Sequence, residues 1–235
     1  MTDIGGALGA AFSMIVHFDR DLAEIVGLSL RVSLSAVFLA TVIGMPLGAA
    51  LALFRFPGRA AVVVLLNALM GLPPVVVGLI VYLLLSRTGP FGVMGLLFTP
   101  TAMIIAQVLL VVPIVAALTR QVAEDLWAEY EEQLRSLGAG SGQALVALLW
   151  DGRFILMTAV LAGFGRASAE VGGVMIVGGN IDHVTRVMTT AIALEVSKGN
   201  LALALGLGIV LIVLSTAISL AAYQIKEATL RRHAI

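Results

Sequence analysis

Long apolar stretches with few charged side chains dominate this sequence, and most of its charges gather between them. Five stretches have this character, over residues 25–54, 60–86, 101–119, 154–177 and 199–225. A helix of roughly 20 apolar residues crosses the hydrocarbon core of a bilayer. Charged residues make up 12% of the chain, against about 25% in soluble domains. The sequence therefore predicts an all-α, polytopic helical bundle in a lipid bilayer, with about five transmembrane helices.

The apolar stretches are expected to form one membrane domain over residues 24–225, followed by a charged cytoplasmic tail over residues 226–235. At the amino terminus, the apolar run over residues 8–17 is too short to span a bilayer. We therefore expect residues 1–23 to form an interfacial segment, and a sixth span there is the alternative.

Basic residues between the stretches predict the orientation, because cytoplasmic connections carry an excess of Lys and Arg. Five spans place eight basic residues on the side of the connection at 124–151: Arg55, Arg59, Arg120, Arg135, Arg153, Lys226, Arg231 and Arg232. Four lie on the other side: Arg20, Arg87, Arg186 and Lys198. The connection and the carboxyl terminus are therefore expected in the cytoplasm, and the amino terminus outside.

The connection at 124–151 is the longest charged island of the chain. Apolar side chains recur there at helical spacing and predict one apolar face: Trp127, Tyr130, Leu134 and Leu137. A glycine-rich break begins at Gly138, and Ser141 is the expected N-cap of a second short helix. An amphipathic helix of this kind needs a groove in its own bundle or in a partner. An ordinary interfacial loop helix is the alternative.

Several residues inside the stretches are candidates for a gate or a transport pathway: Pro73, Pro74, Arg166, Glu170 and Gly172. Arg166 and Glu170 are four residues apart and would share one face of a continuous helix, where a charged pair is less costly than a lone charge. The two prolines interrupt helical hydrogen bonding, and the freed carbonyls need other partners. A structural lock, a simple kink and close helix packing are the alternatives for these residues.

The sequence lacks the residues for several chemistries. It contains no cysteine, no G-x-x-x-x-G-K-[ST] phosphate-binding loop and only three scattered histidines. Its net charge is zero, so it has no electrostatic signature of nucleic-acid binding. We expect no catalytic site, no metal site and no cofactor in this chain.

The charged island resembles the EAA motif of ABC importer permeases. Glu132, Gly138 and the aliphatic Leu148 match that pattern, whereas Gln133-Leu134 and Trp150-Asp151 stand where alanines and Leu-Pro are typical. In that family the motif forms a coupling helix that docks on a separate ATPase subunit. The resemblance implies the following ATPase-coupling residues: Glu131, Glu132, Leu134, Leu137, Gly138 and Leu148.

A second segment, residues 164–200, resembles permeases of the tungstate, molybdate and sulfate importer group, and most closely the tungstate branch. Residues 70–107 resemble the same branch. The similarity implies an external loop that faces a solute-binding protein, with these residues: Gly179, Asn180, Arg186, Thr189 and Thr190.

The resemblance as a whole implies a type I permease fold in the cytoplasmic membrane of a bacterium or archaeon. It implies a homodimer that works with an ATP-binding cassette subunit and an extracytoplasmic binding protein. The transported anion is expected to be tungstate, with molybdate and sulfate as alternatives. A channel or secondary carrier that needs no partner remains the alternative class.

Overall fold

The computed structural model describes residues 20–233, with side chains up to Gln224. Every regular element in this range is a helix, so the predicted all-α class is confirmed. Most of the expected interfacial segment, residues 1–19, and the last two residues of the tail lie outside the described residues.

Three helices are long and apolar enough to cross a membrane: α2 (Arg20–Leu53), α5 (Pro100–Ser136) and α10 (Leu201–His233). Two bent pairs qualify when each pair is counted as one span. They are α3 (Arg59–Met70) with α4 (Pro74–Leu85), bent by 101°, and α6 (Ser141–Asp151) with α7 (Arg153–Ser168), bent by 75°. The described residues thus contain three to five candidate spans.

The break between α3 and α4 follows from its sequence, Gly71-Leu72-Pro73-Pro74. Proline has no N–H to donate, and it disfavours helical geometry in the residue before it. Pro73 is extended, with φ −63° and ψ 124°, and Pro74 is the first residue of α4, a position that proline tolerates well. The two prolines therefore end one helix and begin another.

Helix α5 is longer than the expected span at 101–119, because it continues through the charged island to Ser136. Pro113 lies inside α5, and no glycine or proline follows it before Gly138 to end the helix. At about 1.5 Å per residue, α5 is about 55 Å long and exceeds the bilayer core. The first helix of the island is therefore the end of α5.

The expected continuous span at 154–177 is divided in the structure. Helix α7 ends at Ser168, and a short helix, α8 (Gly172–Gly178), follows after three residues. The Glu170 side chain accepts a hydrogen bond from the Gly173 N–H at 2.9 Å and so satisfies an amide at the start of α8. Arg166 and Glu170 do not share the face of one helix.

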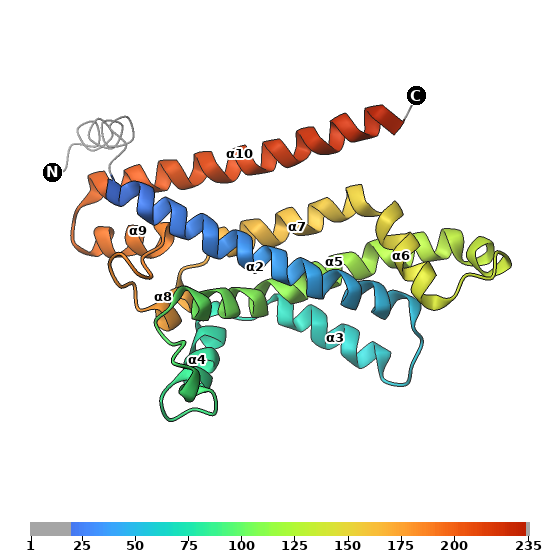
Figure 1. Cartoon of the computed structure of the whole chain (residues 1–235), viewed down its shortest axis with the longest axis horizontal. Helices are drawn as coiled ribbons and strands as arrows, with labels where there is room; N and C mark the ends of the chain where they lie inside the picture. Colours follow the sequence, from blue (N-terminus) through green and yellow to red (C-terminus); the bar gives the residue numbers. More distant parts are fainter. Residues whose placement is uncertain (1–19, 234–235) are drawn as a thin grey trace. The chain divides into compact units, whose positions relative to one another are not determined.

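The chain forms two compact units. The described part of unit 1 comprises residues 20–35, 73–107 and 168–221. One of its apolar clusters joins the start of α2 to α10 and to α9 (Met188–Ser197), around buried Met188, Ala191 and Leu207. Helices α4 and α8 also pack together in this unit (Figure 1). Beyond α4, a short 3₁₀ turn, η1 (Gly92–Met94), leads to α5.

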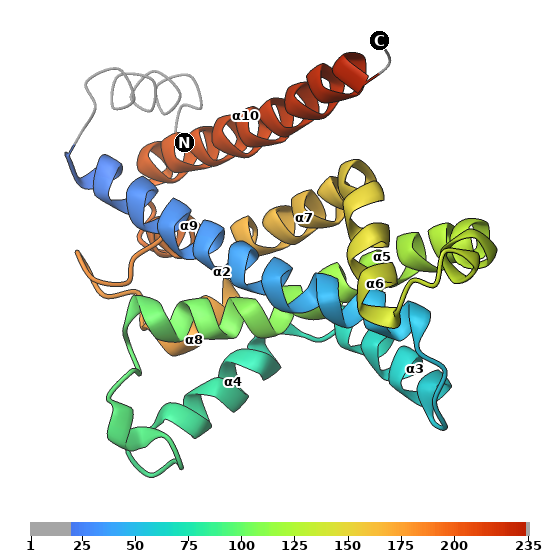
Figure 2. The same ribbon diagram turned by 45° about the vertical axis from the view of Figure 1, so that its right-hand side comes forward.

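Unit 2 comprises the described residues 36–72, 108–167 and 222–233. In this unit α3 lies beside α5, with Leu66 packed against Ala116 and Ala117 (Figure 2). A second cluster packs Leu145 and Leu149 of α6 against small buried residues of α2 and α5. Unit 2 therefore holds α6 by its own apolar core.

Candidate functional site

The end of α5 and helix α6 form a sharp turn, which we call the elbow (residues 129–151). Gly138 has φ +71°, a conformation that L side chains rarely adopt. The Ala139 N–H reaches back to the Leu134 carbonyl at 3.0 Å, which closes the end of α5. The N-cap of α6 is Gly140, one residue before the expected Ser141, and its N–H donates to the Gln143 side chain at 2.9 Å.

The predicted coupling residues are brought together at the elbow, but they differ in exposure. Glu131 forms an ion pair with Arg135 at 2.5 Å, and Glu132 is exposed. Leu137 is 74% exposed and Leu134 is half-buried. Leu148 is only 1% exposed, so its side chain packs inside unit 2. In this structure Leu148 supports the elbow from within.

Helix α6 has two faces. Ala144 and Leu148 are buried on one face, while Val146 and Trp150 are 65% and 69% exposed on the other. A shallow hollow on the exposed face is lined by Gly142, Gln143, Val146, Ala147 and Trp150. The sequence comparison with the EAA pattern missed Val146 and Trp150. Val146 and Trp150 are four residues apart and share one helix face, and each lies two positions after Ala144 or Leu148 on the opposite face. This pattern is the sequence signal that identifies them.

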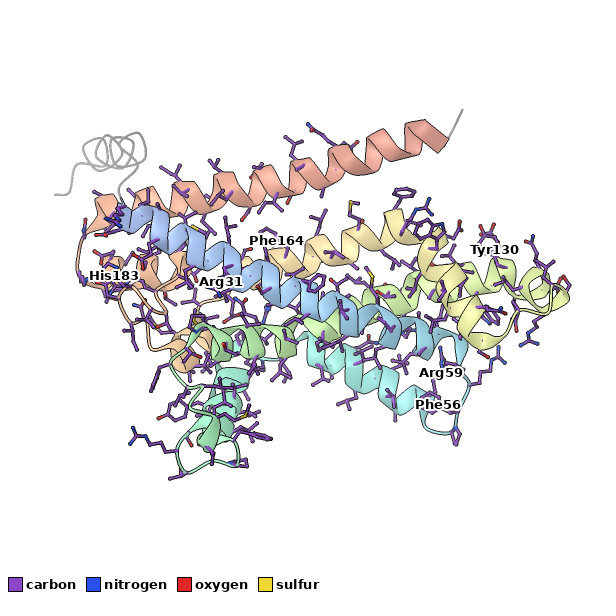
Figure 3. The ribbon with its side chains drawn as sticks, viewed as in Figure 1. Arg31, Phe56, Arg59, Tyr130, Phe164 and His183 are labelled. Carbon is purple, nitrogen blue, oxygen red and sulfur yellow. The ribbon has the colours of Figure 1, made fainter. Side chains whose placement is uncertain are left out.

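A cluster of two arginines and one glutamate lies just before the elbow in α5. In Figure 3, Arg59 is labelled in this cluster and Tyr130 is labelled at the start of the elbow. Arg59, from the start of α3, and Arg120, from α5, both form ion pairs with Glu124. The Arg59 Nε also donates to the Leu51 carbonyl at 2.7 Å, at the end of α2. Three helices of unit 2 are thereby joined at the point where the charged part of α5 begins.

The predicted gate or pathway residues fall in both units. In unit 1, Pro74 and Gly173 approach so closely that a Cβ on Gly173 would lie 2.9 Å from the Pro74 carbonyl oxygen. Gly172 lies equally close to Val75, where a Cβ would be 2.7 Å from a methyl group. The backbone carbonyl of Glu170 accepts a hydrogen bond from Thr189 at 2.7 Å. These contacts join the starts of α4, α8 and α9.

In unit 2, Arg166 lies in the last turn of α7. Its guanidinium donates to the Leu72 carbonyl at 3.4 Å, next to the break between α3 and α4. The predicted ion pair with Glu170 is not among those of the described residues.

Of the predicted external-loop residues, Gly179, Asn180 and Arg186 lie between α8 and α9, whereas Thr189 and Thr190 belong to the first turn of α9. Thr189 and Thr190 are buried, and Thr190 Oγ1 accepts a hydrogen bond from the Val187 N–H at 3.1 Å. Gly179 and Asn180 have positive φ values of 71° and 50°. Arg186 pairs with Asp182 at 2.6 Å. Thr189 and Thr190 therefore support the loop by hydrogen bonds from the start of α9, while Gly179 is exposed on the loop.

A small hollow of unit 1 lies where this loop meets the start of α2, and its polar lining includes Asp21, Glu24, Asp182, His183 and Arg186. His183 Nδ1 lies 2.9 Å from Glu24 Oε2, so the loop is tied to α2 (Figure 3). This hydrogen bond, with the negative charge of Asp182, raises the pKa of His183 above its ordinary value. This contact could not be predicted from sequence spacing, because its partners are 159 residues apart.

Glu195 of α9 is a second buried acid in unit 1. Its carboxylate accepts hydrogen bonds from Lys198 at 2.8 Å and from Asn200 at 3.1 Å. The hydrogen bond from Lys198 is the main cause of a lowered pKa of Glu195. The carboxylate is thus held in its charged form at the end of α9.

Comparison with known proteins decides the family. The model of the binding-protein-dependent transport system inner membrane component family matches residues 44–231. The chain belongs to this family. As an inner membrane transport component, it is a membrane protein, in agreement with its apolar helices and with the predicted cytoplasmic-membrane location.

Relatives of this inner membrane component are named as permeases for oxyanions. The tungstate uptake system permease protein of Peptoclostridium acidaminophilum is 41% identical, over 97% of this chain and 100% of that protein. Its counterpart in Campylobacter jejuni is 36% identical, over 74% of this chain and 73% of that protein. A sulfate transport system permease protein of Synechocystis is 31% identical, over 84% and 74%. The predicted resemblance to ABC importer permeases is confirmed.

Proposed function

We propose that this chain is the membrane-spanning permease subunit of an ABC importer that brings tungstate into the cytoplasm. The identity of 41% to a tungstate permease over the full length of that relative carries this proposal. The relative named for sulfate transport is less similar and covers less of the chain, so tungstate is favoured.

The elbow is the proposed docking surface for a separate ATPase subunit. It presents an exposed apolar face on α6, with Val146 and Trp150, and an exposed acidic side chain, Glu132, near the end of α5. Exposed apolar side chains with a charged rim are typical of protein interfaces. In this role the predicted coupling residues act together with the two residues that the sequence analysis missed.

The chain carries no proposed catalytic residue of its own, so ATP hydrolysis is assigned to the partner. Two copies of the chain would form the pathway, and an external binding protein would deliver the anion to the loop between α8 and α9. Closure of the ATPase dimer would then draw the elbows together and change the access of the pathway. The half-buried ion pairs of Glu124 with Arg59 and Arg120 would carry this movement from α5 to α2 and α3.

Transport in proteoliposomes tests the proposal. Vesicles that contain this chain and its ATPase, with the binding protein outside and ATP inside, should accumulate tungstate. Omission of ATP, of the ATPase or of the binding protein should abolish uptake. Uptake by the chain alone would instead identify a channel or a secondary carrier.

Sulfate is a second candidate, because one relative of the chain is named for sulfate transport, and molybdate is the remaining tetrahedral dianion of the predicted group. The same vesicles discriminate among them when each anion is supplied with the cognate binding protein. A higher uptake of sulfate or molybdate than of tungstate would replace the favoured substrate and leave the transporter class intact.

A further inference from the structure

Five arginines of the described residues are partly withdrawn from solvent. Four of them face a carboxylate or an aromatic ring: Arg59, Arg120, Arg153 and Arg186. The fifth, Arg166, has neither kind of partner within residues 20–224. Its contact is the long hydrogen bond to the Leu72 carbonyl, and its Nε is buried without a hydrogen-bond partner. Arg166 is thus a cation with unused hydrogen-bonding capacity.

The position of Arg166 along its helix places this cation inside the bilayer. Arg166 lies thirteen residues after Arg153, where α7 begins, and Leu72 lies thirteen residues after Arg59, where α3 begins. At about 1.5 Å per residue, Arg166 is roughly 20 Å from the start of α7, and Leu72 follows the end of an α3 that is about 18 Å long. The hydrocarbon core is about 30 Å thick, and an ionisable side chain at this depth is a candidate functional residue, of which those that line a transport pathway are one class.

Open space adjoins the residue next to Arg166 in the chain. The neighbouring Gly165 is exposed, and a Cβ built on it would meet no atom within 4 Å. In a continuous helix the Leu72 carbonyl would accept a hydrogen bond from the Val76 N–H. At the proline break, the Val76 N–H donates to the Pro73 carbonyl instead. The contact of 3.4 Å with this carbonyl is long for a hydrogen bond and is easily exchanged.

We propose that the Arg166 guanidinium, at the break between α3 and α4, is a transient binding point for the transported dianion. This inference rests on the proposed function. A guanidinium offers two parallel N–H groups to an oxyanion, and in the empty pathway the Leu72 carbonyl takes one of them. One positive charge neutralises only half of a dianion, so the bound anion keeps a net negative charge and is released readily. Conduction needs sites of this weak kind.

Substitutions that separate charge from hydrogen bonding test the proposal in the complete transporter. In Arg166→Gln the amide can still donate to Leu72, but the positive charge is lost. Arg166→Lys keeps the charge. Arg31→Gln is the matched control, because Arg31 is an exposed arginine of α2 (Figure 3). Each complex is reconstituted with its ATPase and binding protein, and both tungstate uptake and ATP hydrolysis are measured.

We expect Arg166→Gln to lower the maximal rate of tungstate uptake by about tenfold or more, because a charge attraction in a partly dry site is lost. ATP hydrolysis stimulated by the loaded binding protein should stay near the wild-type rate. Arg166→Lys should keep uptake within about threefold, and Arg31→Gln should be unchanged.

Wild-type uptake by Arg166→Gln would overturn the proposal, and so would an equal loss in the lysine variant. Failure of Arg166→Gln to assemble would make Arg166 a structural residue and would also overturn it. Absence of tungstate uptake by the wild-type transporter would instead refute the proposed function, which keeps the two failures distinct.

Discussion

Gly138 is the residue on which the geometry of the elbow depends most. Its φ of +71° disfavours every L side chain, although a Cβ there would meet no other atom. We expect Gly138→Ala to strain the turn by about 1 kcal/mol and to lower the ratio of anion uptake to ATP hydrolysis. Gly208→Ala is the control, because Gly208 also has open space but lies inside α10 without a positive φ. Equal effects of the two substitutions would contradict the conformational argument.

His183 and Glu24 make a pH-dependent contact between the loop and α2. The raised pKa of His183 means that protonated His183 is stabilised in the folded chain. The contact is therefore fully present below the ordinary pKa of 6.5 and is lost as the pH rises through the higher folded value. NMR titration of the imidazole should give a lower pKa in Glu24→Gln than in the wild type. An unchanged pKa would show that Glu24 is not the cause.

At the scale of elements, α6 is predicted to separate stability from partner binding. Leu148→Ala should destabilise the fold by about 2–5 kcal/mol, because it removes a fully buried side chain. Val146→Asp changes the exposed face and should leave the fold intact while it reduces copurification of the ATPase. Thermal unfolding and pull-down of the ATPase measure the two effects. Normal ATPase binding by Val146→Asp would move the interface elsewhere.

The contact between α4 and α8 depends on glycine. A Cβ on Gly78 would lie 2.8 Å from the Gly173 Cα, and backbone atoms cannot move aside easily. We expect Gly78→Ala to destabilise the protein by about 1–3 kcal/mol through overpacking, measured by denaturant unfolding in detergent. Gly27→Ala, in an open position of α2, should be neutral or stabilising. A neutral Gly78→Ala would mean that the two helices separate easily.

Local rules applied to the sequence predicted the helical class. They also predicted that Pro73 and Pro74 interrupt helical hydrogen bonding, and the structure has the break between α3 and α4 there. It did not predict the break after Ser168, because that break depends on a side-chain hydrogen bond from Glu170 and on glycine contacts with α4. The extension of α5 could not be predicted from the charge pattern, because a charged island between apolar stretches indicates the start of a new element. The family pattern indicated that Leu148 belongs to the coupling motif, but it did not indicate that the side chain is buried. The burial of Leu148 depends on how α6 packs in unit 2.

At the scale of the whole molecule, the chain is proposed to act as a homodimer within a larger assembly. The exposed apolar residues of α2 and α4 leave ample surface for lipid and for a second copy. Mass measurement of the purified complex should give two copies of this chain for two ATPase subunits. A complex with one copy and a different permease would contradict the homodimer and would leave the transporter class unchanged.

The proposed function requires that this chain carries tungstate across the membrane. Elemental analysis of cells with and without the chain, at limiting external tungstate and with the ATPase and binding protein present in both, tests it most directly. Cellular tungsten should fall to background without the chain and return with the wild-type protein. Undiminished accumulation of tungsten in cells that lack the chain would contradict it.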